Sequence, residues 1–273
     1  MHGFSTRLGG SSRAYGGKSL NLGYTKDDAR AAVDRNRLAF LRGLGPIEQS
    51  TRGKSARPWP LITARQVHSD LIHLVDAETQ GIPTGDGLIT ATPGLWLGMQ
   101  TADCLPIILV DAKHRAVGVL HAGWRGTLKR IVEKGLGEMH RRFGTNPADI
   151  KAAIGPGIAK CCYEVGEELR VKFESQFAYA ETLFHEVKDS DPVREKYPLL
   201  FLTARAPGHS ELPKKIFLDL VEANRRQLIA VGVRERSIEA SPLCTSCRTE
   251  LLFSHRAEKG KTGRMMAVAG IRD

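Results

Sequence analysis

The chain has 273 residues, 41% hydrophobic and 26% charged, which is typical of a globular protein and not of a disordered or fibrous one. Its longest uninterrupted apolar stretch, Leu105–Val110, is far shorter than the roughly 20 residues that a helix needs to span a bilayer. Forty Lys and Arg against thirty Asp and Glu give a net charge of +10, which permits anionic partners without selecting among them.

The first third of the chain predicts short strands around one helix. Residues 1–25 are rich in Gly and Ser and predict loops and short strands. From Asp27 apolar residues recur at helical spacing, and we expect this helix to be closed by Gly43. Residues 45–60 carry several Gly and Pro and predict a loop. Strands are expected at 61–67, 71–75 and 87–90.

The central segment predicts a hairpin followed by a helix. Leu95–Val110 has the pattern of one long strand, Asp111–Arg115 that of a polar turn, and Ala116–His121 that of a second strand. The sequence His-Ala-Gly-Trp-Arg-Gly-Thr then leads into an amphipathic helix. We expect the buried face of that helix to carry Ile131, Val132, Leu136 and Met139.

The last part of the chain mixes strands and helices. A strand at 150–154 ends in Gly-Pro-Gly, and a helix is expected over Val165–Phe177. Residues 178–212 show weak periodicity, whereas Phe217–Val231 predicts a helix with Gly232 at its C-cap. Strands are expected near 236–240 and 265–271. The order of elements, with no repeat or linker, predicts one α+β domain over residues 1–273.

Cys104 and His121 are the first pair of residues that point to chemistry. If the turn centres near Ala112–Lys113, residue 104 lies opposite residue 121, with Cβ atoms about 4.5–5.5 Å apart. A register shifted by one residue would put the two side chains on opposite faces of the sheet. The hairpin therefore favours a thiol beside an imidazole, provided that this register holds.

Three interpretations of this pair stay open. A Cys with two His can bind Zn²⁺ and leave a fourth position for water or substrate. A His can instead activate the Cys as a covalent nucleophile. The thiol can also be an ordinary buried side chain in an apolar strand. Asp103, next to Cys104, either holds one of its neighbours by hydrogen bonds or marks the polar side of the strand.

The other cysteines and histidines restrict the choice of metal chemistry. The nine histidines include no His-X-His pair, which disfavours a multicopper oxidase. Cys244 and Cys247 form one CxxC, which alone is weak, and Cys161 and Cys162 are adjacent. These four permit a thiolate site or simple local packing, so their role is left open. With five cysteines and no pattern of a secretory signal, we expect reduced thiols and a cytoplasmic protein.

A series of motifs along nearly the whole chain resembles the YfiH family, which is also labelled laccase-domain or polyphenol-oxidase-like. They occur in the family's order. They are His2–Arg7, Ser19–Gly23, Gln66–Ser69, Gly85–Thr90, Thr101–Pro106, His121–Gly126, Ile154–Ile158, Cys161–Val165, Cys244-Thr245, Phe253–Arg256 and Thr262–Arg264. The chain departs from the common pattern in its 45–60 loop and its 178–212 segment.

This resemblance implies a fold, a metal site and an activity. The fold would be a four-layer α/β/β/α sandwich with mixed sheets. The metal ligands would fall on His68, Cys104 and His121, with Zn²⁺ favoured over copper. The activity would be phosphorolysis of adenosine, inosine and methylthioadenosine, together with deamination of adenosine. The resemblance also suggests a weaker link to editing of peptidoglycan precursors.

The remaining site residues follow from the needs of these reactions. Phosphate requires cations and backbone N–H donors, for which we choose Arg7, Arg125 and the amides near Gly123–Thr127. Ser5 and Asn21 are expected to bind sugar or base by hydrogen bonds. The proton-transferring group is left open among Asp103, Asp86 and Glu164.

Two other functional classes remain as alternatives. A Cys–His hydrolase would lose activity when Cys104 is alkylated and would be indifferent to chelators. A nucleic-acid-binding protein would show affinity that falls steeply with salt and no turnover. The favoured partners are purine nucleosides and phosphate, with no membrane; a nucleic acid is disfavoured, and the oligomeric state is left open.

Overall fold

The computed structural model describes residues 1–45, 58–188 and 214–272. The chain divides into two compact units, a large one formed by Met1–Ala159 with Leu220–Asp273 and a small one formed by Lys160–Asp219. Most of the predicted 45–60 loop, and the 178–212 segment from residue 189 onward, lie outside the described residues. The prediction of one domain over the whole chain stays a prediction.

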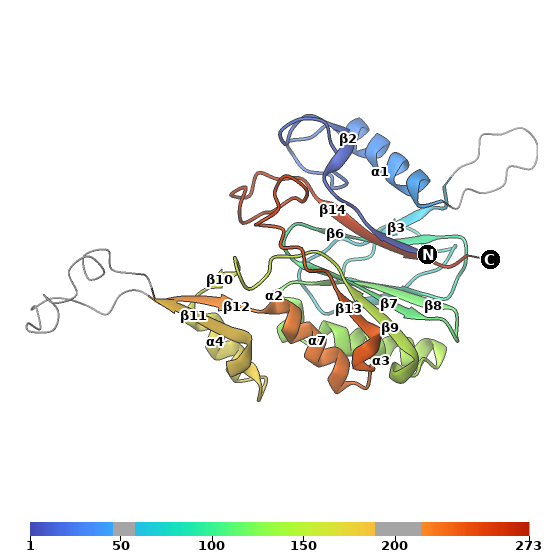
Figure 1. The fold of residues 1–273 in the computed structure, drawn as a ribbon. Helices are drawn as coiled ribbons and strands as arrows, with labels where there is room; N and C mark the ends of the chain where they lie inside the picture. Colours follow the sequence, from blue (N-terminus) through green and yellow to red (C-terminus); the bar gives the residue numbers. More distant parts are fainter. Residues whose placement is uncertain (46–57, 189–213, 273) are drawn as a thin grey trace, which may run out of the picture. The chain divides into compact units, whose positions relative to one another are not determined.

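The large unit contains a four-stranded sheet covered by a helix (Figure 1). The strand order is β1 (His2–Phe4), β14 (Met265–Gly270), β6 (Trp96–Thr101) and β3 (Leu61–Thr63). The first three strands are antiparallel, and β3 runs parallel to β6. Helix α1 (Arg30–Leu44), which follows β2 (Leu8–Ser12), packs Leu41 against Trp96 and Met266 of this sheet.

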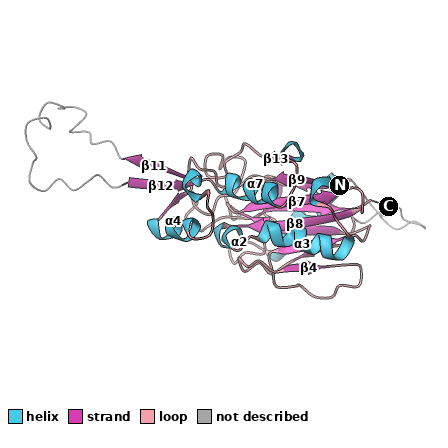
Figure 2. Cartoon of the chain, turned by 90° about the horizontal axis from the view of Figure 1, so that it is seen from below, coloured by secondary structure: helices cyan, strands magenta, loops and turns pink. Residues whose placement is uncertain are grey.

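The second sheet of the large unit has six strands. Their order is β13 (Ile238–Ala240), β9 (Ile150–Ile154), β7 (Leu105–Asp111), β8 (Ala116–Ala122), β5 (Gly87–Thr90) and β4 (Ile72–Leu74). The outer pairs β13–β9 and β4–β5 are parallel, and the inner pairs are antiparallel. Figure 2 shows this sheet beneath helices α2 (Trp124–Leu128), α3 (Ile131–Phe143) and α7 (Leu220–Ala230).

The main core lies between these two sheets. Leu97 and Met99 of β6 pack there with Ile108 of β7 and Val119 of β8, and all four are fully buried. On the outer face of the second sheet, the predicted apolar face of α3 is buried, so that the layers run helix, sheet, sheet, helix. The expected mixture of helices and mixed sheets is confirmed.

The small unit has its own sheet and aromatic core. Its strands β10 (Glu164–Val165), β12 (Lys214–Leu218) and β11 (Phe184–Lys188) pair antiparallel in that order. Helix α4 (Glu167–Glu174) contributes Phe173, whose ring lies 5.6 Å from Phe177 and 5.9 Å from Phe184, measured between centroids. Short 3-10 helices follow at Ala180–Leu183 here and at Pro147–Asp149 and Glu235–Ser237 in the large unit.

The expectation of one long strand over 95–110 is wrong. The segment forms two strands in different sheets, β6 up to Thr101 and β7 from Leu105. Residues 102–104 cross between the sheets, and Asp103 adopts a left-handed backbone with φ of 91° that ends regular pairing. Both strands are buried on both faces, so the apolar pattern gave no sign of the break.

Several predicted ends also differ. The helix expected over 217–231 begins at Leu220, because Lys214–Leu218 pair as β12. The helix expected over 165–177 is Glu167–Glu174, preceded by strand β10. Gly43 does not close α1, which ends at Leu44 before Gly45 with φ of 110°. The strand expected over 61–67 is only Leu61–Thr63, and Arg65 beyond it forms an isolated bridge to Thr84.

The C-terminal end of α7 agrees with the sequence. Gly232 has φ of 101°, and the N–H of Val233 donates to the carbonyl of Leu228 at 3.0 Å, as glycine-closed helices do. Within the described residues, no helix combines the length and the apolar character needed to cross a membrane.

Candidate metal centre

The structure brings together the three predicted ligands. The ring nitrogens of His68 and His121 and the Sγ of Cys104 all lie within 4.8 Å of one another. His68 comes from the loop between β3 and β4, Cys104 from the crossing between the sheets, and His121 from the end of β8. Three segments distant in sequence therefore converge on one point.

The hairpin register explains why Cys104 and His121 meet. The observed pairing joins Leu105 to Ala122 and Pro106 to His121, so Cys104 does not lie directly opposite His121. The predicted register is off by two residues because the turn centres between Lys113 and His114, one residue later than assumed. A shift of two leaves every side chain on its original face, so the thiol and the imidazole still converge.

Gly123 leaves room for this cluster. A Cβ atom at this position would lie 2.7 Å from Cys104 Sγ and 3.3 Å from His68 Cδ2. Its backbone, with φ of −79° and ψ of 176°, suits any residue. Gly123 is needed because it leaves space beside the ligands, and not because of its backbone conformation.

Asp86 holds both histidines. Its carboxylate is buried and accepts the Nδ1–H of His121 at 2.8 Å, which directs Nε2 of that ring toward the cluster. It also accepts the backbone N–H groups of Val67, His68 and Ser69 at 3.2, 3.1 and 2.6 Å. These amides fix His68 in a left-handed backbone with φ of 56°. One carboxylate thus orients one ring and positions the backbone of the other.

The electrostatics favour a thiolate between two imidazoles. Burial raises the pKa of Cys104, but the charge and hydrogen bonds of His121 and His68 outweigh it and lower that pKa to about 6. Burial lowers the pKa of His121, whereas the Cys104 thiolate and Asp86 raise it to about 9. Hydrogen bonds from His121 and Ser69 overcome burial and hold the pKa of Asp86 well below its usual range. The sulfur is thus in the form that binds metals.

These residues fit a metal with mixed nitrogen and sulfur ligands. In tetrahedral zinc sites bond lengths of about 2.0–2.3 Å place neighbouring ligand atoms roughly 3.3–3.6 Å apart, which small side-chain adjustments reach from the observed spacing. Three protein ligands leave one position for a reactant. Asp86 supplies the carboxylate partner that metal-bound imidazoles usually have.

The Asp103 side chain bonds to none of the three predicted ligands. Its carboxylate accepts the hydroxyls of Thr245 at 2.6 Å and Ser254 at 2.8 Å and the backbone N–H of Arg256 at 2.7 Å. Asp103, which directly precedes Cys104, therefore connects two C-terminal segments to the crossing between the sheets.

Arg7 is enclosed by the chain. Its guanidinium donates to the carbonyls of Tyr15 and Thr249 and to the carboxylate of Glu258, and it lies over the ring of Phe253. The structure thus gives Arg7 a role in holding the C-terminal segment together. Its expected contact with phosphate stays a prediction.

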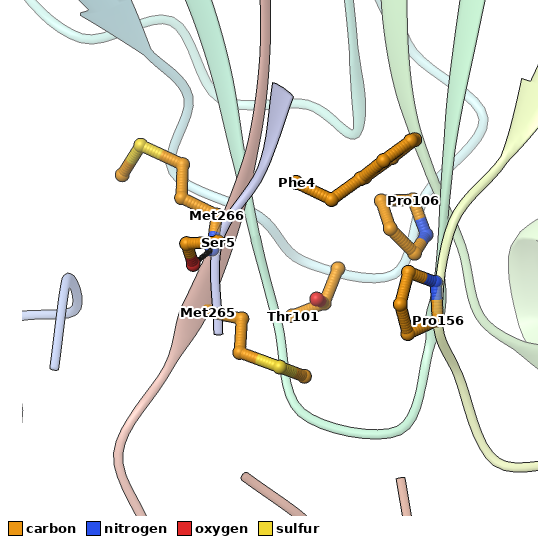
Figure 3. Close-up of a pocket in the computed structure, with 7 residues that line it drawn as sticks. All are labelled: Phe4, Ser5, Thr101, Pro106, Pro156, Met265 and Met266. Atoms are coloured by element: carbon orange, nitrogen blue, oxygen red, sulfur yellow. Dashed lines mark hydrogen bonds between the residues drawn. The ribbon is translucent and has the colours of Figure 1, made fainter. Parts of the chain in front are cut away.

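The side chains of Ser5 and Asn21 also form hydrogen bonds with other residues of the chain. Ser5 Oγ accepts the N–H of Met266 at 2.9 Å, beside a cavity of about 10 Å³ between the sheets that is too small for a nucleoside (Figure 3). Asn21 is fully buried, and its amide bonds to Gly23, Asp28 and Arg264. Their substrate-binding roles stay predictions.

Arg125 and Glu164, the remaining predicted residues outside the cysteines, are both exposed. Arg125 is exposed on α2, with its guanidinium 4.3 Å above the ring of Trp124. Glu164 is exposed on β10 of the small unit. Cys244 is buried in the large unit and accepts the N–H of Ala159 at 3.4 Å, while Cys247 is exposed.

Sequence reasoning missed the positioning residues around the cluster. The sequence indicates Asp86 only as a candidate proton-transferring group, although its place between two glycines before a buried strand is typical of a tight turn. Ser69 follows His68 and bonds to the same carboxylate at 2.7 Å. Thr245 and Ser254 lie in motifs whose partner, Asp103, is far away in sequence.

Comparison with known proteins places the chain in a family. A family model described as Multi-copper polyphenol oxidoreductase laccase matches residues 1–272. The chain belongs to this family. The structure of the hypothetical protein YfiH from Bacillus licheniformis superposes with a TM-score of 0.80 at 32% identity, covering 99% of this chain and 92% of that one. The resemblance to the YfiH family is therefore confirmed.

Two curated relatives are named as enzymes. Purine nucleoside phosphorylase YlmD from Geobacillus stearothermophilus is 34% identical over 281 residues, which covers 99% of this chain and 90% of the relative. Adenosine deaminase RL5, from an unknown prokaryotic organism, is 31% identical and covers 97% of this chain and 91% of the relative. These names agree with the expectation that the chain is an enzyme.

Proposed function

We propose that this protein is a zinc-dependent purine nucleoside enzyme. It would cleave adenosine, inosine and methylthioadenosine with phosphate, and deaminate adenosine. The observation that carries the proposal is the convergence of His68, Cys104 and His121 within 4.8 Å, in a family whose relatives include a purine nucleoside phosphorylase and an adenosine deaminase.

Different residues of the chain would bind the metal, orient its ligands and bind phosphate. His68, Cys104 and His121 would hold the zinc, while Asp86 keeps the His121 ring in the tautomer that offers Nε2. When bound, zinc supplies a Lewis acid that lowers the pKa of water and polarises a reacting group. Arg125 and the amides of the Gly123–Thr127 turn would orient phosphate through charge-assisted hydrogen bonds.

The proposed mechanism also needs a carboxylate that transfers protons. Asp86 already accepts five hydrogen bonds, and the side chain of Asp103 accepts three. Both therefore suit positioning better than proton transfer. Glu164 stays a prediction for this role.

Elemental analysis followed by an assay with adenosine tests the proposal. We expect about one zinc per chain, inosine as the product without phosphate, and adenine with ribose 1-phosphate only when phosphate is present. The His68→Ala variant should lose zinc and both activities, whereas His2→Ala, an exposed histidine in β1, should keep them. Copper in place of zinc, with turnover of phenols and none of adenosine, would contradict the proposal.

A Cys–His hydrolase is a second candidate, favoured by the lowered pKa of Cys104 beside His121. Alkylation of Cys104 stops activity in both cases, so chelation separates them. A hydrolase acting through the thiolate keeps its activity after metal removal and in the His68→Ala variant. The zinc enzyme loses activity in both experiments and regains it in the first when zinc is restored.

A further inference from the structure

Two polar residues of α7 form hydrogen bonds with α2 inside the large unit (Figure 2). Asn224 Nδ2 donates to the hydroxyl oxygen of Thr127 at 2.9 Å, and Gln227 Nε2 donates to the carbonyl oxygen of the same residue at 2.8 Å. All three residues are fully buried. One helix therefore holds Thr127 at two of its atoms.

The partners of these two amides fix their orientation. A carbonyl oxygen only accepts hydrogen bonds, so the group that faces the Leu220 carbonyl at 2.8 Å is the NH2 of Asn224. The same argument places the NH2 of Gln227 at the Thr127 carbonyl. The two amide oxygens, Asn224 Oδ1 and Gln227 Oε1, are buried and have no hydrogen-bond partner among the described residues.

Stability alone does not account for amides at these two positions. A buried oxygen without a partner costs free energy, and apolar side chains of similar shape would fill the contact between α2 and α7 without that cost. Most buried polar groups in proteins have partners, so such exceptions need a reason other than stability. The amides give α2 a fixed place beside α7, because hydrogen bonds have a defined length and direction and apolar contacts do not.

Thr127 connects these amides to the surroundings of the metal centre. It ends the Gly123–Thr127 turn, which the proposed function assigns to phosphate together with Arg125. The N–H of Thr127 donates to the Gly123 carbonyl at 2.9 Å. Gly123 in turn lies against the cluster, because a Cβ atom there would be 2.7 Å from Cys104 Sγ. The place of α2, and with it the place of Arg125, therefore depends on its contacts with α7.

We infer that Asn224 and Gln227 are positioning residues for phosphate in the proposed phosphorolysis, acting through Thr127 on Arg125 and the amides of its turn. This inference rests on the proposed function and deepens it. Both residues are fully buried in α7 and hold the turn from within the protein. Phosphate takes part in phosphorolysis and not in deamination, so a displaced turn should impair the first reaction and spare the second.

The double variant Asn224→Leu/Gln227→Met tests this inference in the zinc-loaded full chain. It replaces each amide by an apolar side chain of similar shape, and the Thr127 hydroxyl becomes free to donate to the Gly123 carbonyl. We expect the KM for phosphate, and its Kd measured by calorimetry, to rise about 10- to 100-fold, as misplaced orienting groups predict. The rate of adenosine deamination and the zinc content should be unchanged, and Tm should not fall.

Leu228→Met is the matched control, because Leu228 is fully buried in the same helix and its apolar side chain forms no hydrogen bond to α2. It should leave the KM for phosphate unchanged. An equal rise in this control would overturn the inference, as would a double variant with the wild-type KM and Kd for phosphate. A lower Tm with phosphorolysis and deamination reduced by the same factor would show a purely structural role and also overturn it.

The outcomes separate this inference from the proposed function. Phosphate binding that weakens in the double variant, in a protein that turns over no nucleoside, would support the positioning role and contradict the function. Phosphorolysis with a KM for phosphate that is the same in the double variant would support the function and overturn the inference. A wild-type protein that does not bind phosphate would overturn the inference as well.

Discussion

At the scale of single residues, Asp86 contacts two of the three residues of the metal centre. It orients the His121 ring and fixes the backbone of His68, and both contacts need an acceptor. In Asp86→Asn an amide N–H would face the N–H groups of Val67 and Ser69. We expect zinc affinity to fall about 10- to 100-fold, as for other carboxylates behind metal-bound imidazoles, measured by competition with a chromogenic chelator.

Asp70→Asn is the matched control for this experiment. Asp70 lies in the loop that carries His68 and pairs with Lys129 and Lys134 at the surface, where ion pairs contribute little. Its zinc affinity should equal that of the wild type. Equal losses in both variants would show that the loop is sensitive as a whole and that Asp86 has no special role.

Gly123 permits a test of the space beside the ligands. In Gly123→Ala the new methyl group would press on Cys104 Sγ and on the His68 ring, at 2.7 and 3.3 Å. We expect a folded protein with reduced zinc content, measured by elemental analysis after dialysis. Gly126→Ala in α2 is the control, because its Cβ would meet no atom closer than 3.4 Å. Full zinc content in both variants would contradict the steric argument.

At the scale of elements, the hairpin of β7 and β8 depends on a buried carboxylate at its turn. Asp111 accepts the N–H groups of Lys113 and His114, each at 3.0 Å, and the His114 ring nitrogen at 2.8 Å. Burial raises the pKa of Asp111, but the hydrogen bonds of His114 outweigh it and leave that pKa lowered. The carboxylate therefore stabilises the fold above its unfolded pKa of about 3.9, and this stabilisation is lost as pH falls through the folded pKa.

The consequence is a pH-dependent cost of Asp111→Asn. At pH 7 we expect the free energy of unfolding to drop by about 1.5–3 kcal/mol, the range for hydrogen bonds to a charged group. The difference from wild type should shrink below pH 4, where the wild-type carboxylate also becomes neutral. Urea unfolding at pH 7, 4 and 3 measures it. Asp76→Asn, in an exposed turn, should cost little at every pH. A difference for Asp111→Asn that is constant with pH would refute the argument.

The elements that the sequence predicted well are those with one exposed side or a clear closing residue. Helix α3 has a distinct buried face, and Gly232 closes α7 just beyond its last residue, as periodicity and capping rules predict. The break between β6 and β7 was invisible because it depends on Asp103, whose side-chain partners lie 142 to 153 residues away. Local patterns contain no information about such contacts.

At the scale of the whole molecule, the site residues also differ in whether local sequence patterns relate them or only the folded chain brings them together. The ligands Cys104 and His121 could be related through one hairpin, and His68 only through the family resemblance. The substrate-binding and phosphate-binding roles of Asn21 and Arg7 stay predictions, since a polar residue in a motif near the termini suits substrate binding or long-range packing equally. Only the folded chain shows that their hydrogen bonds join segments more than 240 residues apart.

Because the three ligands come from separate segments, a bound metal should stabilise the large unit. A ligand that binds only the folded chain adds about 2.7 kcal/mol at one hundred times its Kd, or a Tm shift on the order of 5–10 °C for a protein of this size. Scanning calorimetry of zinc-loaded and chelator-treated protein measures this shift, and zinc added back should restore it. In His68→Ala the chelator should leave Tm unchanged, because the cluster has lost a ligand. A chelator-induced fall in Tm that persists in this variant would mean that the stabilising metal binds at another site.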